Sequence, residues 1–238
     1  MSPDVKLDFA RYARIGLEEA VFCDAKTPDQ IAAILGEAAL RDARLLLTRL
    51  FGEKLDALSA VYGAAIDYCP ISRTAFFGEP RPIEQRGDVV IVAAGTSDIP
   101  VAREAWRTLR YYGHEATSIA DIGVAGLWRL TERIDEIRAH PIIIVVAGMD
   151  AAIASVLGGL AGGAIICAPT SVGYGAADGG RTALNAILTS CAPGLVACNI
   201  DNGYGAACAA LRLLCAASRL GGPFAPQEAL RIEPAGVH

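Results

Sequence analysis

The sequence predicts an α/β protein in which a doubly wound parallel sheet follows a small α+β domain. Beyond Gly87, apolar runs of strand length alternate five times with helical segments. Ala, Gly, Val, Ile and Leu dominate these runs, as in parallel strands that are buried on both faces. A charged segment with two prolines, Gly78 to Arg86, is the best linker in the chain. We therefore expect domains at residues 1–85 and 86–220, followed by an irregular tail at 221–238.

The first domain combines short strands with a helix. A strand is expected at residues 20–23. Thr27 has the side chain of a helix N-cap, and Pro28 suits the first helical position. The helix that begins there is expected to continue to about Leu50. Two further strands are expected at residues 62–68 and 74–77.

The second domain is expected to alternate regularly between strands and helices, with Gly113 as the C-cap of its first helix. On the fourth helix, we expect Leu184, Ile187 and Leu188 to share one face. The expected strands are residues 88–94, 115–119, 142–147, 164–168 and 195–200, and the expected helices are residues 100–112, 127–138, 151–160, 181–189 and 203–218.

Composition excludes several classes of protein. The net charge is −5, which gives no support for nucleic-acid binding. No stretch is long and apolar enough to span a bilayer, and no signal region precedes the first domain, so we expect a cytoplasmic protein. The seven cysteines include no CxxC pair, which argues against a zinc ribbon and predicts reduced thiols. A hydrophobic content of 53% also suits a chain that buries surface in a homo-oligomer.

Ligands of such sheets gather at the carboxyl ends of the strands. The first strand leads into Gly95, Thr96, Ser97 and Asp98, which offer a glycine turn, two hydroxyls and a carboxylate to a phosphate or a ribose. The alternative is that Ser97 or Asp98 only caps the following helix.

The third strand leads into Gly148, Met149 and Asp150. The Asp150 carboxylate is a candidate acid/base group, or else a charge that favours the start of a helix.

The glycine-rich loop after the fourth strand is the most distinctive stretch of the chain. A strand, a glycine loop and a helix start form a small site for an anionic ligand, although an ordinary strand-to-helix connection is an equal alternative. Asn202 follows the fifth strand in a further polar, glycine-bearing segment. No GxGxxG fingerprint is present. The candidate binding residues in the loop are Thr170, Ser171, Gly173, Tyr174 and Gly175.

Cys191 lies at a chain reversal just before Pro193, where a ligand can reach a thiol. Nucleophilic cysteines act as thiolates and need a lowered pKa. Cys23 is the competing candidate, because Lys26 is close enough in sequence to stabilise its thiolate. The remaining possibility is that both thiols are packing residues.

Four segments in order resemble the LarB family: Gly95–Ala102, Pro169–Gly175, Ser190–Ala192 and Asn199–Gly203. The stretch Val21–Pro28 also resembles the N-terminal region of that family. The second half is similar to PurE-type aminoimidazole ribonucleotide carboxylases, which implies a three-layer flavodoxin-like fold and an octameric assembly.

The resemblance implies that the substrate is nicotinic acid adenine dinucleotide. The expected reaction adds a carboxylate derived from carbon dioxide or bicarbonate to the pyridinium ring and cleaves the phosphoanhydride. The products would be pyridinium-3,5-biscarboxylic acid mononucleotide, an intermediate in the synthesis of the nickel-pincer nucleotide cofactor, and AMP. Cys191 would form the covalent adduct, and Asp150, which stands where the family usually has Glu, would be the base. No tightly bound cofactor or metal ligand set is implied, although Mg²⁺ suits phosphoanhydride cleavage.

Two alternatives remain. One is a PurE-like enzyme that acts on an aminoimidazole ribonucleotide. The other is a non-catalytic nucleotide-binding paralogue, which is suggested by Asp150 and by Trp128, where the family usually has His.

Overall fold

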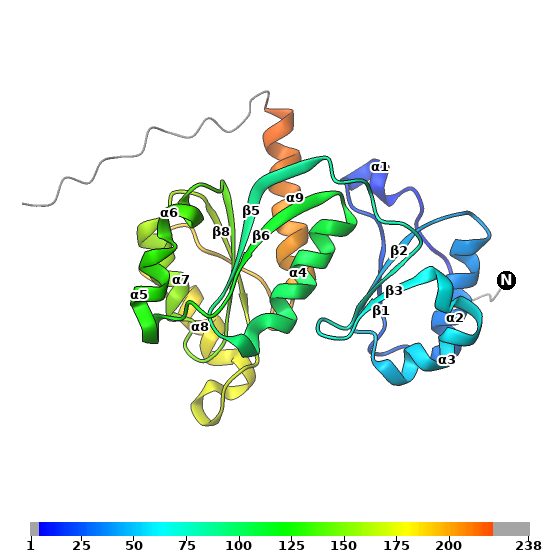
Figure 1. Ribbon diagram of the computed structural model, residues 1–238, viewed down its shortest axis with the longest axis horizontal. Helices are drawn as coiled ribbons and strands as arrows, with labels where there is room; N and C mark the ends of the chain where they lie inside the picture. The colour runs from blue at the N-terminus through cyan, green and yellow to red at the C-terminus, as the bar shows by residue number, and fades with distance from the viewer. Residues whose placement is uncertain (1–4, 221–238) are drawn as a thin grey trace, which may run out of the picture.

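A computed structural model describes residues 5–220 as two domains that lie side by side, each built on its own β-sheet (Figure 1). The second domain holds a five-stranded parallel sheet in the order β6-β5-β7-β8-β9. The tail expected at residues 221–238 lies outside the described residues. Strands of this sheet are β5 (Gln85–Ala93), β6 (His114–Ile119), β7 (Ile142–Ala147), β8 (Ala164–Pro169) and β9 (Val196–Ala197).

Helices cover both faces of this sheet, so the second domain has three layers (Figure 1). One face carries α4 (Ile99–Tyr111) and α9 (Gly203–Arg219). The other face carries α5 (Leu127–Glu132), α6 (Ile134–Arg138), α7 (Ala152–Leu160) and α8 (Arg181–Leu188). Successive β5 residues alternate between two separate cores, as the two-residue period of a strand requires. The predicted flavodoxin-like α/β fold is confirmed.

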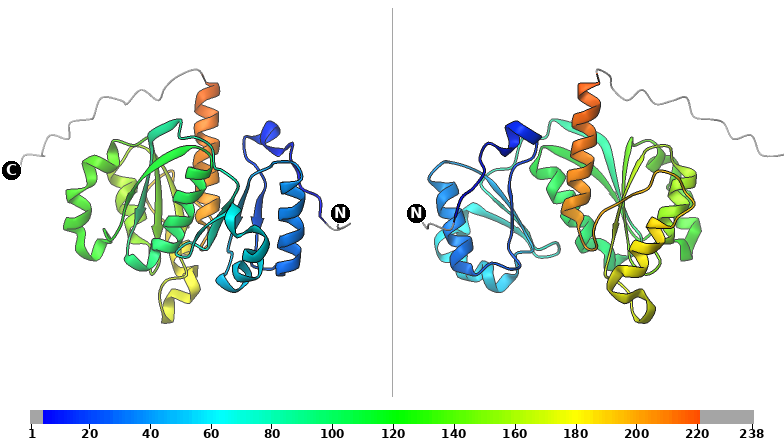
Figure 2. Two further views of the ribbon diagram at one scale, coloured as in Figure 1. Left: turned by 45° about the vertical axis from the view of Figure 1, so that its right-hand side comes forward. Right: turned by 180° about the vertical axis from the view of Figure 1, so that it is seen from behind.

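The first domain is a small α+β unit with a mixed sheet in the order β1-β2-β4-β3. β1 and β2 are parallel, and the other pairs are antiparallel. Its two longer helices lie on the side that faces away from the second domain (Figure 2). The elements are α1 (Arg11–Ile15), β1 (Ala20–Phe22), α2 (Pro28–Ala39), β2 (Leu45–Thr48), α3 (Gly52–Tyr62), β3 (Ile66–Cys69) and β4 (Thr74–Phe77).

The long helix expected from Pro28 to Leu50 is wrong in its second half. The N-terminus is as expected, since Thr27 and Gln30 form a reciprocal capping box. The helix ends at Ala39, and Asp42 turns the chain with a φ of 49°. Residues 45–48 then form a fully buried strand between β1 and β4. Burial of the leucines in the sheet outweighs their helix propensity.

Other expected elements need correction. Residues 52–62 form α3, a helix that was not expected, and the strand expected at residues 62–68 begins only at Ile66. The N-cap of α3, Phe51, has no capping side chain that the sequence could reveal. The helix expected at residues 127–138 breaks at Arg133, where φ is −108°. The last strand shrinks from residues 195–200 to two residues. On α8, Ile187 is buried, whereas Leu188 is 66% exposed.

The two domains share one hydrophobic core. Leu17, Leu46 and Phe76 of the first domain pack in the same cluster as Leu109 and Tyr111 of α4. The Phe76 and Tyr111 rings lie 5.7 Å apart. Because these side chains are almost completely buried, the junction has the character of an interior rather than of a flexible interface.

Glu18 connects the two domains through charged hydrogen bonds. Its carboxylate accepts from the Tyr111 hydroxyl at 2.6 Å and from the Arg81 guanidinium at 2.8 Å, and it also pairs with Arg44. The Glu18 amide donates to the Tyr112 hydroxyl at 2.8 Å. Burial opposes ionisation, but the donated hydrogen bonds outweigh it and hold the pKa of Glu18 below its usual value.

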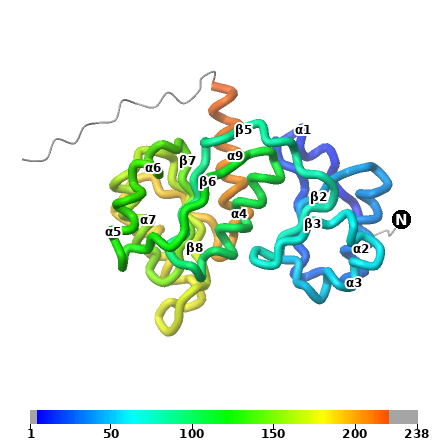
Figure 3. The backbone as a smooth tube through the Cα atoms, in the orientation of Figure 1, coloured from blue at the N-terminus to red at the C-terminus, as the bar shows by residue number. Residues whose placement is uncertain are grey.

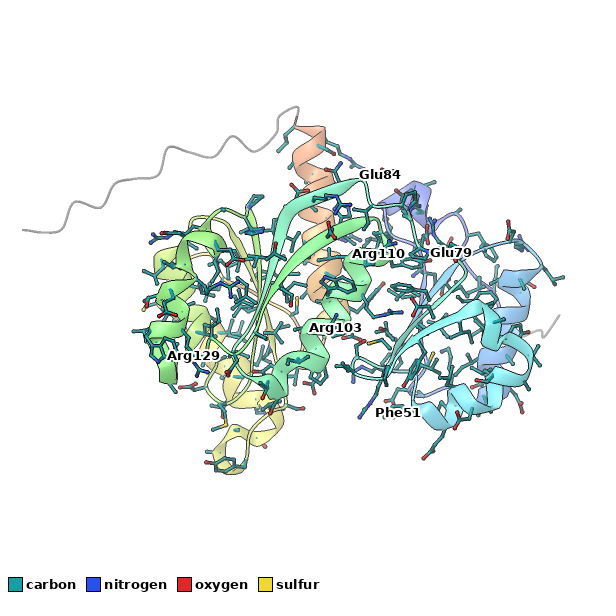
Figure 4. All side chains as sticks on the ribbon, viewed as in Figure 1. Phe51, Glu79, Glu84, Arg103, Arg110 and Arg129 are labelled. Atoms are coloured by element: carbon teal, nitrogen blue, oxygen red, sulfur yellow. The ribbon has the colours of Figure 1, made fainter. Side chains whose placement is uncertain are left out.

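The linker between the domains is held along its length rather than free. The chain crosses once to the second domain, just before β5 (Figure 3). Arg81 donates its amide to Tyr111, and the Arg110 guanidinium returns a 2.7 Å hydrogen bond to the Arg81 carbonyl. Figure 4 labels Arg110 and Glu79 on the two sides of this junction. Gly113 turns the chain with a φ of 84°, and a Cβ there would lie 2.4 Å from the Pro82 carbonyl oxygen.

We expect Glu18→Gln to lower the free energy of unfolding at pH 7 by about 1.5–3 kcal/mol, the value of a charged hydrogen bond. A lowered folded-state pKa gives stability that is present above the ordinary value of 4.5 and is lost as the pH falls through the folded value. The difference between the variant and the wild type should therefore shrink below about pH 4.5 in urea denaturation. Glu136→Gln, which removes an exposed pair with Arg133, is the matched control. An equal loss in both variants would contradict this role of Glu18.

Candidate active site

A hydrogen bond between Asp98 and Thr170 organises the carboxyl edge of the five-stranded sheet. Asp98 follows β5 and Thr170 follows β8, and the Thr170 hydroxyl donates to the Asp98 carboxylate at 2.6 Å. The other carboxylate oxygen accepts from the Gly95 amide at 2.9 Å. Asp98 is 3% exposed and Thr170 is fully buried. Burial raises the pKa of Asp98, and the donated hydrogen bonds only partly offset it.

Gly148 lies where this hydrogen bond passes over the end of β7. A Cβ at this position would lie 2.4 Å from the Val172 carbonyl oxygen and 2.6 Å from the Thr170 hydroxyl. The next amide, of Met149, donates to the Val172 carbonyl at 2.9 Å. Glycine therefore permits the loops after β7 and β8 to touch.

Three non-glycine residues at the same edge have strained backbone conformations. Met149, Ala151 and Asp201 have φ values of 54°, 47° and 54°, which non-glycine residues adopt only at a cost. The turn through Met149 and Ala151 leaves Asp150 exposed, with a single long contact of 3.4 Å from its carboxylate to the Ala152 amide. Such strain clusters where a protein holds a site in a defined shape.

The loop after β8 is tied to the segment after β9. The Ser171 amide donates to the Asp201 carboxylate at 2.8 Å. Asn202 caps α9 by accepting from the Gly205 amide at 2.7 Å. Beyond Gly173 the loop projects past the sheet edge (Figure 2), and the Tyr174 ring is 84% exposed. Gly175 lies in this projecting part.

The structure thus brings most of the candidate residues together. Five of them form the base of the carboxyl edge, which we call its floor: Gly95, Asp98, Gly148, Met149 and Thr170. Ser171 and Asn202 lie beside this floor. The side chains of Thr96, Ser97 and Asp150 are exposed at the same edge. They remain candidate ligand-binding and acid/base groups.

Arg49 and Glu104 also belong to this edge, although sequence reasoning missed both. Arg49 follows β2 of the first domain, and its guanidinium donates to the Asp201 carbonyl at 2.8 Å. Glu104 is 5% exposed and accepts from the Tyr204 amide at 3.1 Å. Burial raises the pKa of Glu104, against the smaller effects of the α9 amides and Arg49. Their place at this edge is visible only in the structure, from their positions at the domain junction.

Cys191 stands apart from this edge within one chain. α8 starts beside the Thr170 carbonyl, which a Cβ on Gly180 would approach to 2.6 Å. Eight helical residues then lead away from the edge over about 12 Å. Cys191 follows, next to Ser190, whose hydroxyl contacts that of Ser155 on α7 at 2.7 Å. The Cys191 residue is exposed.

The other thiols differ from Cys191 in exposure. Cys23 is fully buried, and burial raises its pKa to about 12 despite the opposite effect of Lys26. The expectation that Lys26 activates Cys23 is therefore wrong. Burial likewise raises the pKa of Cys167 to about 12 and of Cys208 to about 11. Cys69 has a lowered pKa, because hydrogen bonds from the 71–72 turn and the charge of Arg107 outweigh its burial.

Comparison with known proteins identifies the two domains separately. Residues 3–79 match the LarB/PurE-like N-terminal domain, and residues 88–220 match AIR carboxylase. The chain belongs to the LarB family. An uncharacterized protein of Methanocaldococcus jannaschii is 35% identical over 209 residues, covering 85% of this chain and 80% of that protein.

A solved structure of a Treponema denticola PurE2 variant aligns with 57% of this LarB-family chain and 92% of its own, with 15% identity and a TM-score of 0.42. Within residues 5–220, no helix combines the length and apolar character needed to cross a membrane. The same part of this LarB-family protein contains no group of three or more His, Cys, Asp or Glu side chains arranged to hold a metal ion.

We expect Thr170→Val to destabilise the protein by about 1.5–3 kcal/mol, because it removes a hydrogen bond from a buried carboxylate without changing side-chain volume. Urea denaturation measures this loss. Thr131→Val is the control, since Thr131 is exposed and its hydroxyl reaches only the Trp128 carbonyl. Equal stability of Thr170→Val and the wild type would contradict the organising role of the Asp98–Thr170 hydrogen bond.

Proposed function

We propose that this protein carboxylates the pyridinium ring of nicotinic acid adenine dinucleotide and cleaves its phosphoanhydride. The products are pyridinium-3,5-biscarboxylic acid mononucleotide and AMP. The observation that carries the proposal is the order of the two matched domains, because the LarB-type N-terminal domain precedes the AIR carboxylase domain in one chain. Carbon dioxide, free or from bicarbonate, is the co-substrate.

The chemistry assigns a role to an exposed thiol. A cationic pyridinium ring is too poor in electrons to attack carbon dioxide. Addition of the Cys191 thiolate gives a neutral dihydropyridine whose carbon 5 is nucleophilic. That carbon bonds to carbon dioxide, a base then removes its proton, and the carbon–sulfur bond breaks to restore the aromatic ring and the thiolate. Water separately cleaves the phosphoanhydride and releases AMP.

Asp150 is the proposed base for the ring proton. Its carboxylate is exposed at the carboxyl edge and has only the 3.4 Å contact with the Ala152 amide, so it is available to accept a proton. The floor beside it, formed by Gly95, Asp98, Gly148 and Thr170, offers the backbone groups of three strand ends to the phosphates and riboses.

A homo-oligomer, which we propose to be an octamer, would complete the site. Cys191 lies away from the carboxyl edge of its own chain, so in this assembly the thiol of one copy faces the edge of another. Exposed apolar side chains flank Cys191 in the sequence: Leu188 is 66% exposed and Val196, on the edge strand β9, is 50% exposed. Contact between copies through α8 and β9 would cover both side chains.

Carboxylation of an aminoimidazole ribonucleotide is the second candidate, because residues 88–220 match AIR carboxylase. It provides no role for a thiol or for the first domain. An assay with each substrate and labelled bicarbonate distinguishes the two reactions by the mass of the product.

We expect the wild-type protein with nicotinic acid adenine dinucleotide, bicarbonate and Mg²⁺ to release AMP and a nucleotide with one added carboxylate, measured by mass spectrometry. Mg²⁺ is included because a divalent cation assists phosphoanhydride cleavage. Cys191→Ser should bind the dinucleotide but lose at least about 1,000-fold in rate, since a hydroxyl adds poorly to the ring. Cys69→Ser, which removes the thiol with the lowered pKa, is the matched control. Turnover by Cys191→Ser at the wild-type rate would refute the proposed mechanism.

Light scattering tests the assembly. The wild type should be an oligomer at micromolar concentration, and Val196→Asp should dissociate it, because a charge would be buried in the proposed contact. Val61→Asp is the control, since Val61 is 75% exposed on α3, far from β9 in the fold. A monomeric wild type would contradict the proposal.

A further inference from the structure

Arg49 reaches out of the first domain onto the carboxyl edge of the second. In the first domain, β1 and β2 are parallel and end together, with Phe22 paired to Thr48. Arg49 follows at once and contacts the carbonyl of Asp201, the residue that also holds the Ser171 amide. Figure 4 labels Phe51, two residues farther along the chain, at the lower end of the first domain in this view. Strand ends of both domains therefore meet at one place.

The Arg49 backbone is held in a strained shape. Its φ of 52° lies in the left-handed region, which an arginine adopts at a cost. The neighbouring Leu50 amide is fixed by a 2.7 Å hydrogen bond to the Arg73 carbonyl. The guanidinium lies 5.6 Å from the Phe22 ring centroid, and that ring is 46% exposed. Backbone, ring and Asp201 together fix the guanidinium at the edge of the site.

Arg49 forms no salt bridge within residues 5–220, although its charge acts on Glu104 from a longer distance. Its hydrogen bond goes to a carbonyl, and no carboxylate of the described chain lies within 4 Å of it. Two other arginines near strand ends differ in this respect: Arg129 pairs with Asp121 at 2.6 Å and Arg181 with Asp178 at 3.7 Å. A guanidinium has five donors, and the Asp201 contact engages only one of its nitrogens.

The second domain places four carboxyl groups at this edge. Asp98, Glu104, Asp150 and Asp201 all lie there. A substrate with a diphosphate would be repelled by such an edge unless a cation faced it. Arg49 is a cation that the first domain places against this edge, and its planar fork suits two phosphate oxygens at once.

We propose that Arg49 is the phosphate-binding residue that the first domain contributes to the active site, so that the substrate diphosphate lies between the two domains. This inference rests on the proposed function for the identity of the dinucleotide. The anion site itself rests on the contacts of Arg49. The first domain thereby acts in substrate selection, favouring nucleotides that carry a phosphate near the reacting ring.

The test compares binding of three compounds by calorimetry in the absence of Mg²⁺: nicotinic acid adenine dinucleotide, inorganic diphosphate and the phosphate-free nicotinic acid riboside. Arg49→Ala should weaken binding of both diphosphate compounds by about 10- to 100-fold and leave riboside binding unchanged. Arg49→Lys keeps the charge but loses the fork, and should fall between the wild type and Arg49→Ala. Arg41→Ala, which removes an exposed arginine of the same domain, should match the wild type.

The outcomes separate this inference from the proposed function. Equal binding of the diphosphate compounds by the wild type and Arg49→Ala would overturn the phosphate role while leaving the proposed reaction intact. A parallel loss of riboside binding would also overturn it, because it would show that Arg49 only holds the domains together. Arg49-dependent binding of inorganic diphosphate without any binding of the dinucleotide would support the anion site and refute the proposed substrate.

Discussion

The hydrogen bond from Thr170 to Asp98 spans the end of β7 and joins two loops that belong to non-adjacent strands. Because both side chains are buried, the carboxylate cannot exchange this donor for water, and the loops stay in one arrangement. The other contacts of the edge depend on that arrangement. Gly148 lies beneath the bond, and the Ser171 amide that follows Thr170 reaches Asp201. Arg49 in turn reaches Asp201 from the other domain.

Sequence patterns predicted the second domain well because its three central strands, β5, β7 and β8, carry apolar side chains on both faces. The expected strand at residues 142–147 agrees with β7, and the glycine-rich loop lies at the carboxyl edge as expected. The first domain was harder, since Leu45–Leu47 has the composition of either a helix or a buried strand. Only pairing with β1 and β4, which are distant in sequence, distinguishes the two.

That error also concealed part of the site. A residue inside a helix that runs to Leu50 has no special position, whereas Arg49 directly after a strand lies where ligands bind. Asp98 shows the opposite case. Its place after β5 identified it correctly as part of the edge, but the sequence could not reveal that its carboxylate is turned inward to Thr170. Contacts between residues 72 positions apart leave no local pattern.

The shared core has a consequence for how such a chain can evolve. Phe76 and Leu46 bury the same α4 surface that Tyr111 helps to form, and Glu18 satisfies the hydroxyl of that tyrosine. If a related protein lost the first domain, the apolar side chains and the tyrosine hydroxyl on this surface of α4 would be exposed to water. A second domain that occurs by itself therefore needs different residues on α4. Gain or loss of the first domain must be accompanied by substitutions on α4. The residues on this surface of α4 in a related sequence should thus indicate whether that protein also has a first domain.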